Sequence, residues 1–159
     1  MKNTFLYVAI LSTALFSCNK EETQFLPYEE QLAIDAKIIE DYLTENGLSA
    51  ESTSEGLRYE ITKTGDGNFP DTGSTVVVNY TGKLLNGSVF DSNTNGSFSF
   101  KLGARQVIAG WDIGIALLSK GGKATLYIPS GLAYGTQGAG SSIGSNEVLI
   151  FEVELVDIR

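Results

Sequence analysis

The chain has 159 residues, 11 basic and 19 acidic side chains, a formal net charge of −8 and no histidine. This length is sufficient for one domain with a hydrophobic core, and the scattered basic residues form no electrostatic surface for nucleic acid. The absence of histidine excludes His-bearing zinc sites, Ser-His-Asp and Cys-His catalysis, and imidazole acid-base chemistry.

The first eighteen residues have the features of a bacterial lipoprotein signal. Lys2 precedes an apolar run at 5–16 that is too short to span a bilayer, and Ser17 and Cys18 follow it. The tetrad LFSC at 15–18 resembles a lipobox, in which the cysteine is acylated and becomes the first mature residue. We therefore predict lipidation at Cys18 and a membrane anchor; an ordinary secretory signal with an incidental cysteine is the alternative.

Charged residues follow this cysteine directly: Lys20, Glu21 and Glu22. A lysine and two acidic residues at this place resemble an export signal of some Gram-negative lipoproteins. This predicts an outer-membrane lipoprotein of a Gram-negative bacterium, facing the periplasm or exposed on the surface. The alternative is that the segment is only a spacer.

An amphipathic helix is predicted over residues 27–46, ended by Gly47. Its apolar residues recur at helical spacing at Leu32, Ala36, Ile39 and Leu43, with Ile34, Ile38 and Tyr42 widening the stripe. Such a stripe has to be buried, either against the helix's own domain or in a weak dimer.

A polar segment at 49–55 reads as a linker and gives the predicted organisation of the chain. Residues 1–17 would be the signal peptide, and residues 18–55 the acylated leader, amphipathic helix and linker. Residues 56–159 would be the main domain.

From residue 57 onward the chain favours β-structure. Apolar and polar residues alternate at 57–62, and a long strand at 75–85 ends at Asn86-Gly87, a strong hairpin signal. Two further strands are predicted at 123–129 and 147–158, joined by a glycine-rich loop at 135–146.

One short helix interrupts the strands, with Trp111, Ile115 and Leu118 on one face and Gly121-Gly122 after it. The pattern predicts an α+β fold in which an antiparallel sheet packs against this helix. A separate N-terminal helix precedes it.

Two short motifs match known sites, but their contexts do not fit. Residues 91–96 spell the first half of a calcium loop, yet Leu102 stands where such a loop needs a bidentate glutamate, and both flanks read as strands. Residues 140–144 fit the G-x-S-x-G pattern of hydrolases, but the chain has no histidine to serve as base, and we interpret them as a flexible loop.

Four segments in order, VNYTGKLLNGSVFDS, FKLGARQVIAGWDIGIALLSKGGKATLYIP, AYG and LIFEVELVDI, resemble the FKBP-type peptidyl-prolyl cis-trans isomerases. The resemblance extends from about residue 57 to the C-terminus. It implies a bent antiparallel sheet of five to six strands wrapped on one short helix, with a proline-binding pocket between them.

The resemblance also implies roles for ten residues. The implied catalytic residues are Tyr80, Phe90, Asp91, Trp111 and Tyr134. The implied substrate-binding residues are Phe98, Val107, Ile108, Ile143 and Phe151. In this reading Trp111 is the pocket floor, the Ile108 N–H and the Tyr134 hydroxyl donate hydrogen bonds to substrate carbonyls, and residues 92–96 form a turn after Asp91.

The implied function is isomerisation of X–Pro bonds in exported proteins, without cofactor or metal and with macrolides as expected inhibitors. A non-catalytic chaperone or partner-binding module is the main alternative, and an aromatic sugar-binding platform is a third. No implied pocket residue lies in the N-terminal helix, so its removal is expected to leave activity intact.

The sequence departs from the family in one loop. Gly144-Ser145-Asn146 follows Ile143 where the family usually has two prolines, and Ser142 replaces a larger apolar residue. Because proline restricts the backbone, its loss puts the rigidity of the loop, the substrate preference and the macrolide affinity in question.

Overall fold

The computed structural model describes residues 26–159. The predicted signal peptide, the lipidation site Cys18 and the charged residues that follow it lie outside this part of the chain. The elements in order are α1 (Tyr28–Glu45), β1 (Glu51–Ser52), β2 (Arg58–Lys63), β3 (Thr75–Leu84), β4 (Val89–Lys101), α2 (Ala109–Ala116), β5 (Lys123–Ile128), the 3₁₀ helices η1 (Ser130–Leu132) and η2 (Gly135–Gln137), and β6 (Leu149–Ile158).

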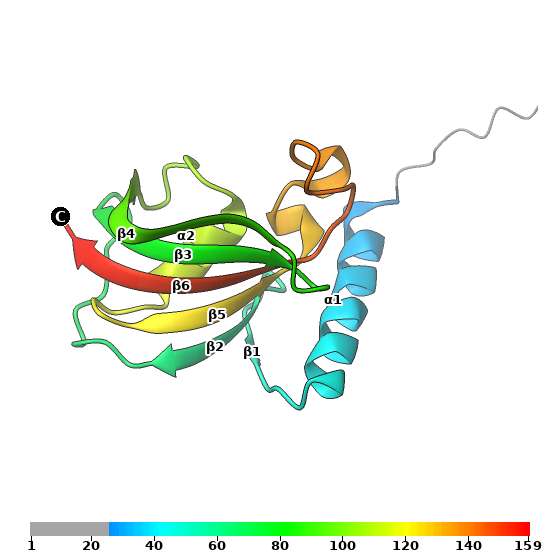
Figure 1. Cartoon of the computed structure of the whole chain (residues 1–159), viewed down its shortest axis with the longest axis horizontal. Coiled ribbons are helices and arrows are strands. Elements are labelled where there is room, and N and C mark those ends of the chain that lie inside the picture. The colour runs from blue at the N-terminus through cyan, green and yellow to red at the C-terminus, as the bar shows by residue number, and fades with distance from the viewer. Residues whose placement is uncertain (1–25) are drawn as a thin grey trace, which may run out of the picture.

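A single antiparallel sheet of six strands, in the order β1-β2-β5-β6-β3-β4, forms the centre of the molecule. Figure 1 shows the sheet twisted, with α2 behind it and α1 standing along one end. The predicted α+β class, the antiparallel sheet with its short helix and the separate N-terminal helix are confirmed.

The main core lies between the sheet and α2, and it depends on their close approach. A Cβ atom on Gly110 would lie 2.5 Å from Ile128 Cγ2, and one on Gly114 would lie 2.5 Å from Leu126 Cδ1. Glycine at these two helical positions therefore lets α2 lie directly against β5. Trp111 and Ile115, 4% and 0% exposed, project from α2 into this core.

The amphipathic helix α1 packs on its own domain, which was the first of the two predicted ways to bury its apolar stripe. Ile39 and Leu43 form a second cluster with Tyr127, Val148 and Ile150. Tyr127 and Ile150 alternate along β5 and β6 with residues of the main core, so α1 packs at one end of the sheet, on the face opposite to α2. No helix within residues 26–159 is long and apolar enough to cross a membrane.

The predicted width of the apolar stripe on α1 was wrong. Ile34 and Ile38 are 43% and 38% exposed, whereas Asp35 between them is completely buried. The helix is rotated so that this carboxylate faces the domain, because it has hydrogen-bond partners there.

Two predicted irregular segments are strands. The polar segment at 49–55 contributes β1, in which Glu51 pairs with Tyr59 and Ser52 with Arg58, so it is not only a linker. The expected turn at 92–96 lies within β4 as a bulge, since Val78 pairs with Phe98 but Tyr80 pairs with Asn93.

Burial on α1 gives a stability prediction with a matched control. Ile39→Ala should lower the free energy of unfolding by about 2–5 kcal/mol, because it leaves a cavity in the second cluster. Ile34→Ala, on the exposed face of the same helix, should change it by no more than about 0.5 kcal/mol. Urea titrations of both variants measure this, and equal effects would show that α1 does not pack as described.

Candidate active site

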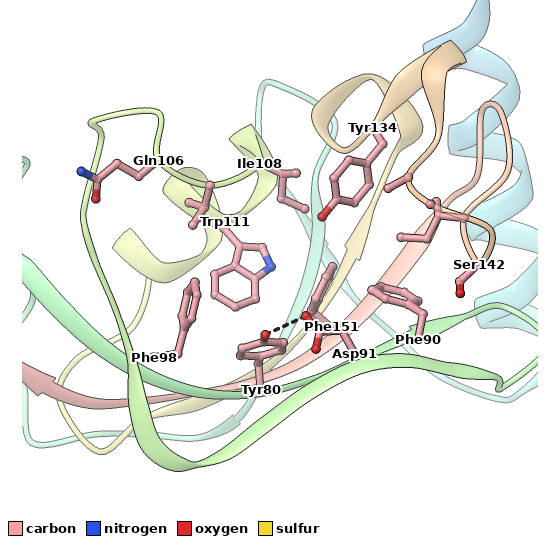
Figure 2. A pocket seen from close by; sticks show the side chains of 14 residues that line it. Tyr80, Phe90, Asp91, Phe98, Gln106, Ile108, Trp111, Tyr134, Ser142 and Phe151 are labelled. Atoms are coloured by element: carbon pink, nitrogen blue, oxygen red, sulfur yellow. Dashed lines mark hydrogen bonds between the residues drawn. The ribbon is translucent and has the colours of Figure 1, made fainter.

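A pocket of about 460 Å³ opens between the sheet, the start of α2 and the loop after β5. Figure 2 shows its side chains converging from these elements. All ten residues that the resemblance implied line it: Tyr80, Phe90, Asp91, Phe98, Val107, Ile108, Trp111, Tyr134, Ile143 and Phe151. The structure thus brings these residues together, while their individual roles stay predictions.

The sheet register supplies one wall of the pocket. Gly82 of β3 pairs with Asp91 of β4 on one side and with Phe151 of β6 on the other. A Cβ atom on Gly82 would lie 2.6 Å from Phe90 Cε2 and 2.7 Å from Phe151 Cε1. A glycine at this position therefore leaves room for both rings.

Three rings meet the indole of Trp111 with their planes steeply inclined to it. The ring centroids of Tyr80, Phe151 and Phe98 lie 4.9, 5.2 and 5.6 Å from that of Trp111, at interplanar angles of 77°, 89° and 84°. Such edge-to-face contacts are favourable for aromatic quadrupoles. Trp111 is only 4% exposed, so this packing holds its indole in place in the lining of the pocket.

A tyrosine–carboxylate pair stands at the side of the pocket. The Tyr80 hydroxyl donates a hydrogen bond of 2.7 Å to Asp91 Oδ2, drawn as a dashed line in Figure 2. Burial of the phenol, followed by the hydrogen bond and charge of Asp91, raises the pKa of Tyr80 to about 12. Tyr80 is therefore a neutral donor at physiological pH.

The rest of the calcium-like motif is engaged in local contacts. Asn93 Nδ2 donates to Ser97 Oγ at 3.0 Å, and Asn95 Oδ1 accepts from the Ser97 N–H at 3.0 Å. Within residues 26–159 no three Asp, Glu, His or Cys side chains are grouped as a metal site would need.

Three donors in the pocket have no acceptor among the described residues. The buried Nε1 of Trp111 makes no hydrogen bond. The Ile108 N–H, at the start of α2, and the hydroxyl of Tyr134, which is 40% exposed, also donate to no described residue. These groups are free to bind the oxygen atoms of a ligand.

Backbone hydrogen bonds close the loop at 135–146, which contains the predicted flexible loop at 140–144. Ala139 and Ile143 exchange two backbone hydrogen bonds of 2.9 and 3.1 Å, and the Asn146 N–H donates to the Gly135 carbonyl at 2.8 Å. Gly138 has a φ of 62°, and a Cβ there would lie 2.3 Å from the Ile143 carbonyl oxygen. Glycine is thus required for this hairpin, which closes the loop without the two family prolines.

Four lining residues were not among the predicted site residues: Gln106, Ala139, Gly140 and Ser142. They lie outside the strands and α2, where periodicity gives no information. Gln106 also supports the loop before α2, because its Oε1 accepts a 2.9 Å hydrogen bond from the Lys101 N–H.

Comparisons with known proteins agree with this fold and pocket. Residues 66–156 match the family model described as FKBP-type peptidyl-prolyl cis-trans isomerase. The chain is 48% identical over 123 residues to the probable FKBP-type peptidyl-prolyl cis-trans isomerase FkpA of Neisseria meningitidis, a match covering 75% of this chain and 44% of that protein. It is 49% identical over 122 residues to FK506-binding protein 2 of Candida glabrata, with coverages of 70% and 87%.

Among solved structures, the crystal structure of FkpA from Escherichia coli is similar, with a TM-score of 0.68 and 38% identity. That match covers 82% of this chain and 62% of the other, so this chain spans only part of the two FkpA proteins. The segment that matches the family model nevertheless includes all ten implied site residues. The chain therefore belongs to the FKBP-type peptidyl-prolyl cis-trans isomerase family.

Proposed function

We propose that this protein catalyses cis–trans isomerisation of X–Pro bonds in exported proteins, and that the reaction takes place in the aromatic pocket. One observation carries the proposal: a pocket walled by rings contains unpaired donors and a single carboxylate. Membership of the family and the printed names of the relatives support the reaction class.

The pocket suits a proline ring. The pyrrolidine is small and apolar, so it would lie on the indole of Trp111 with Tyr80 and Phe151 beside it. The Ile108 N–H and the Tyr134 hydroxyl would then hold the carbonyls on either side of the proline. These contacts would hold the bound segment with its X–Pro bond placed in the pocket.

Catalysis by this arrangement needs no nucleophile and no proton transfer. Rotation about the amide meets a barrier of about 18–20 kcal/mol because it breaks the resonance of the planar form. The twisted transition state carries less negative charge on the carbonyl oxygen. An apolar pocket therefore disfavours the planar ground state relative to the twisted one.

Asp91 would add to this effect. Its carboxylate, held by Tyr80, lies at the rim of the same pocket. A negative charge near the reacting carbonyl repels the planar amide, with its negative oxygen, more than the twisted amide. The carboxylate thereby lowers the barrier without taking part in a covalent step.

The first test is peptide isomerisation by Asp91→Asn. The asparagine can still accept the Tyr80 hydroxyl but carries no charge, so we expect kcat/KM to fall about tenfold, or about 1.4 kcal/mol of transition-state stabilisation. The melting temperature should stay nearly the same. The exposed Asp71→Asn, away from the pocket, is the control and should retain full activity.

Measurements of peptide binding and isomerisation by the wild type also decide between an enzyme and a non-catalytic binding module. If it binds an X–Pro peptide without accelerating its isomerisation, the protein is a partner-binding or chaperone module and the catalytic proposal is wrong. Several relatives are named FK506-binding proteins. We therefore expect FK506 to compete with the peptide in either case.

The raised pKa of Tyr80 gives a prediction for alkaline pH. An unfolded tyrosine loses its proton near pH 10, whereas folded Tyr80 keeps it to about pH 12. The neutral phenol thus contributes stability that is complete below about pH 10 and declines as the pH rises toward 12. Melting curves over this range should show a smaller decline for Tyr80→Phe than for the wild type. Parallel curves would contradict the hydrogen-bonded, buried phenol.

We further propose that the protein is an outer-membrane lipoprotein acylated at Cys18, which rests on the sequence motif alone. Residues 19–27 would reach at most about 30 Å when fully extended. Such a short tether would keep the pocket close to the membrane surface.

Cys18→Ala tests the anchor. We expect this variant to take up no labelled fatty acid and to leave the membrane fraction, while the wild type is labelled and sediments with membranes. Protease treatment of intact cells then distinguishes surface display from a periplasmic location. A variant that still sediments with membranes after signal cleavage would contradict the lipid anchor.

A further inference from the structure

The position of Tyr134 depends on the short helix η1, which precedes it. Within η1, the Leu132 N–H donates to the Pro129 carbonyl and the Ala133 N–H to the Ser130 carbonyl, each at 2.9 Å. Pro129, which precedes the helix, provides no side-chain cap. The first N–H of η1, that of Ser130, therefore needs an acceptor from another part of the fold.

That acceptor is Asp35 of α1. Its Oδ2 receives hydrogen bonds from the Ser130 N–H at 2.7 Å and from the Ser130 Oγ at 2.6 Å, across 95 positions of sequence. Its Oδ1 accepts from Gln31 Nε2 at 2.8 Å. Asp35 and Ser130 are both 0% exposed.

Burial increases the contribution of these hydrogen bonds to stability. A buried carboxylate is unfavourable unless its oxygen atoms are hydrogen-bonded, and charge-assisted hydrogen bonds are stronger than neutral ones. No other buried acidic side chain occurs in residues 26–159. Asp35 thus caps η1 from outside, in the way that an N-cap residue normally caps its own helix.

Two further contacts hold α1 against the same segment. A Cβ atom on Gly131 would lie 2.6 Å from Tyr28 Cε2, so the Tyr28 ring lies on the backbone of η1. Farther along α1, Ile39 and Leu43 pack with Tyr127, which lies three positions before Ser130. The helix therefore fixes both the end of β5 and the start of η1.

We propose that Asp35 is a positioning residue for the pocket: from α1, it anchors η1 and thereby sets the place of the Tyr134 hydroxyl. The inference rests on the proposed function for the role of Tyr134. Asp35 lies outside the segment 66–156 that matches the family model and lines no part of the pocket. This proposal contradicts the expectation that α1 can be removed without effect on activity, and the experiments below decide between the two.

The decisive experiment is a double-mutant cycle between Asp35→Ala and Tyr134→Phe in the full chain. We expect Asp35→Ala to lower kcat/KM about five- to tenfold in the wild type, but less than about twofold in the Tyr134→Phe background. Equal losses in both backgrounds would overturn the proposal, because a general loss of fold does not depend on the Tyr134 hydroxyl.

Matched variants separate positioning from stability. Asp35→Asn retains an acceptor oxygen and should restore most of the activity that Asp35→Ala loses. Ser130→Ala, which removes only the hydroxyl bond, should give an intermediate loss. Glu30→Ala, on the exposed first turn of α1, should have no effect. All rates are compared well below the melting temperature of each variant.

Hydrogen exchange tests the anchor without any catalysis. In Asp35→Ala, the amides of Leu132 and Ala133 should exchange at least about tenfold faster than in the wild type, with the amide of Val78 in the central sheet much less affected. Unchanged exchange at η1, or equal acceleration at all three amides, would overturn the inference. Because this measurement does not require isomerase activity, an inactive wild type would refute the proposed function and leave the anchor to be judged separately.

Discussion

The close contact between α2 and β5 is the constraint on which both the core and the pocket depend. Gly110 and Gly114 allow the helix to lie on Ile128 and Leu126. This places Trp111 at the boundary between the two, where its ring belongs to the main core and also forms the pocket floor. The stability of the domain and the shape of the site are therefore set by the same packed side chains, and little of the site can change without cost to the fold.

The two helices act on the pocket from opposite faces of the sheet. α2 places Trp111 and Ile108 in the lining of the pocket, whereas α1 packs through Ile39 and Leu43 at one end of the opposite face. Only α2 belongs to the segment that matches the family model. Through the Asp35–Ser130 hydrogen bonds, α1 reaches the loop that carries the pocket's second donor. A helix outside the matched segment is thus hydrogen-bonded to the segment that precedes Tyr134.

The loop over the pocket shows that one kind of restraint can replace another. Proline restricts a loop by limiting the backbone of the unfolded and folded states alike. Here the hydrogen bonds between Ala139 and Ile143 and the tight passage at Gly138 hold the folded loop instead. Such restraints act only once the hairpin has formed, whereas proline also limits the backbone of the unfolded chain.

The sequence by itself determined most of the regular elements and ten of the fourteen residues that line the pocket. Alternation marked the long strands, Asn86-Gly87 marked the hairpin, and the family motifs named ten residues that the structure brings to one pocket. These features are encoded locally, or in motifs whose order along the chain is informative.

Tertiary structure alone decided the remaining features, because each depends on a partner distant in sequence. A two-residue strand such as β1 has no periodicity of its own and exists through its pairing with β2. The bulge in β4 arises from its register with β3. Asp35 is buried, whereas its neighbour Ile34, part of the predicted apolar stripe, is exposed. The burial of Asp35 depends on Ser130, 95 residues away, because a buried carboxylate requires hydrogen-bond donors. Its own helix supplies only the bond from Gln31.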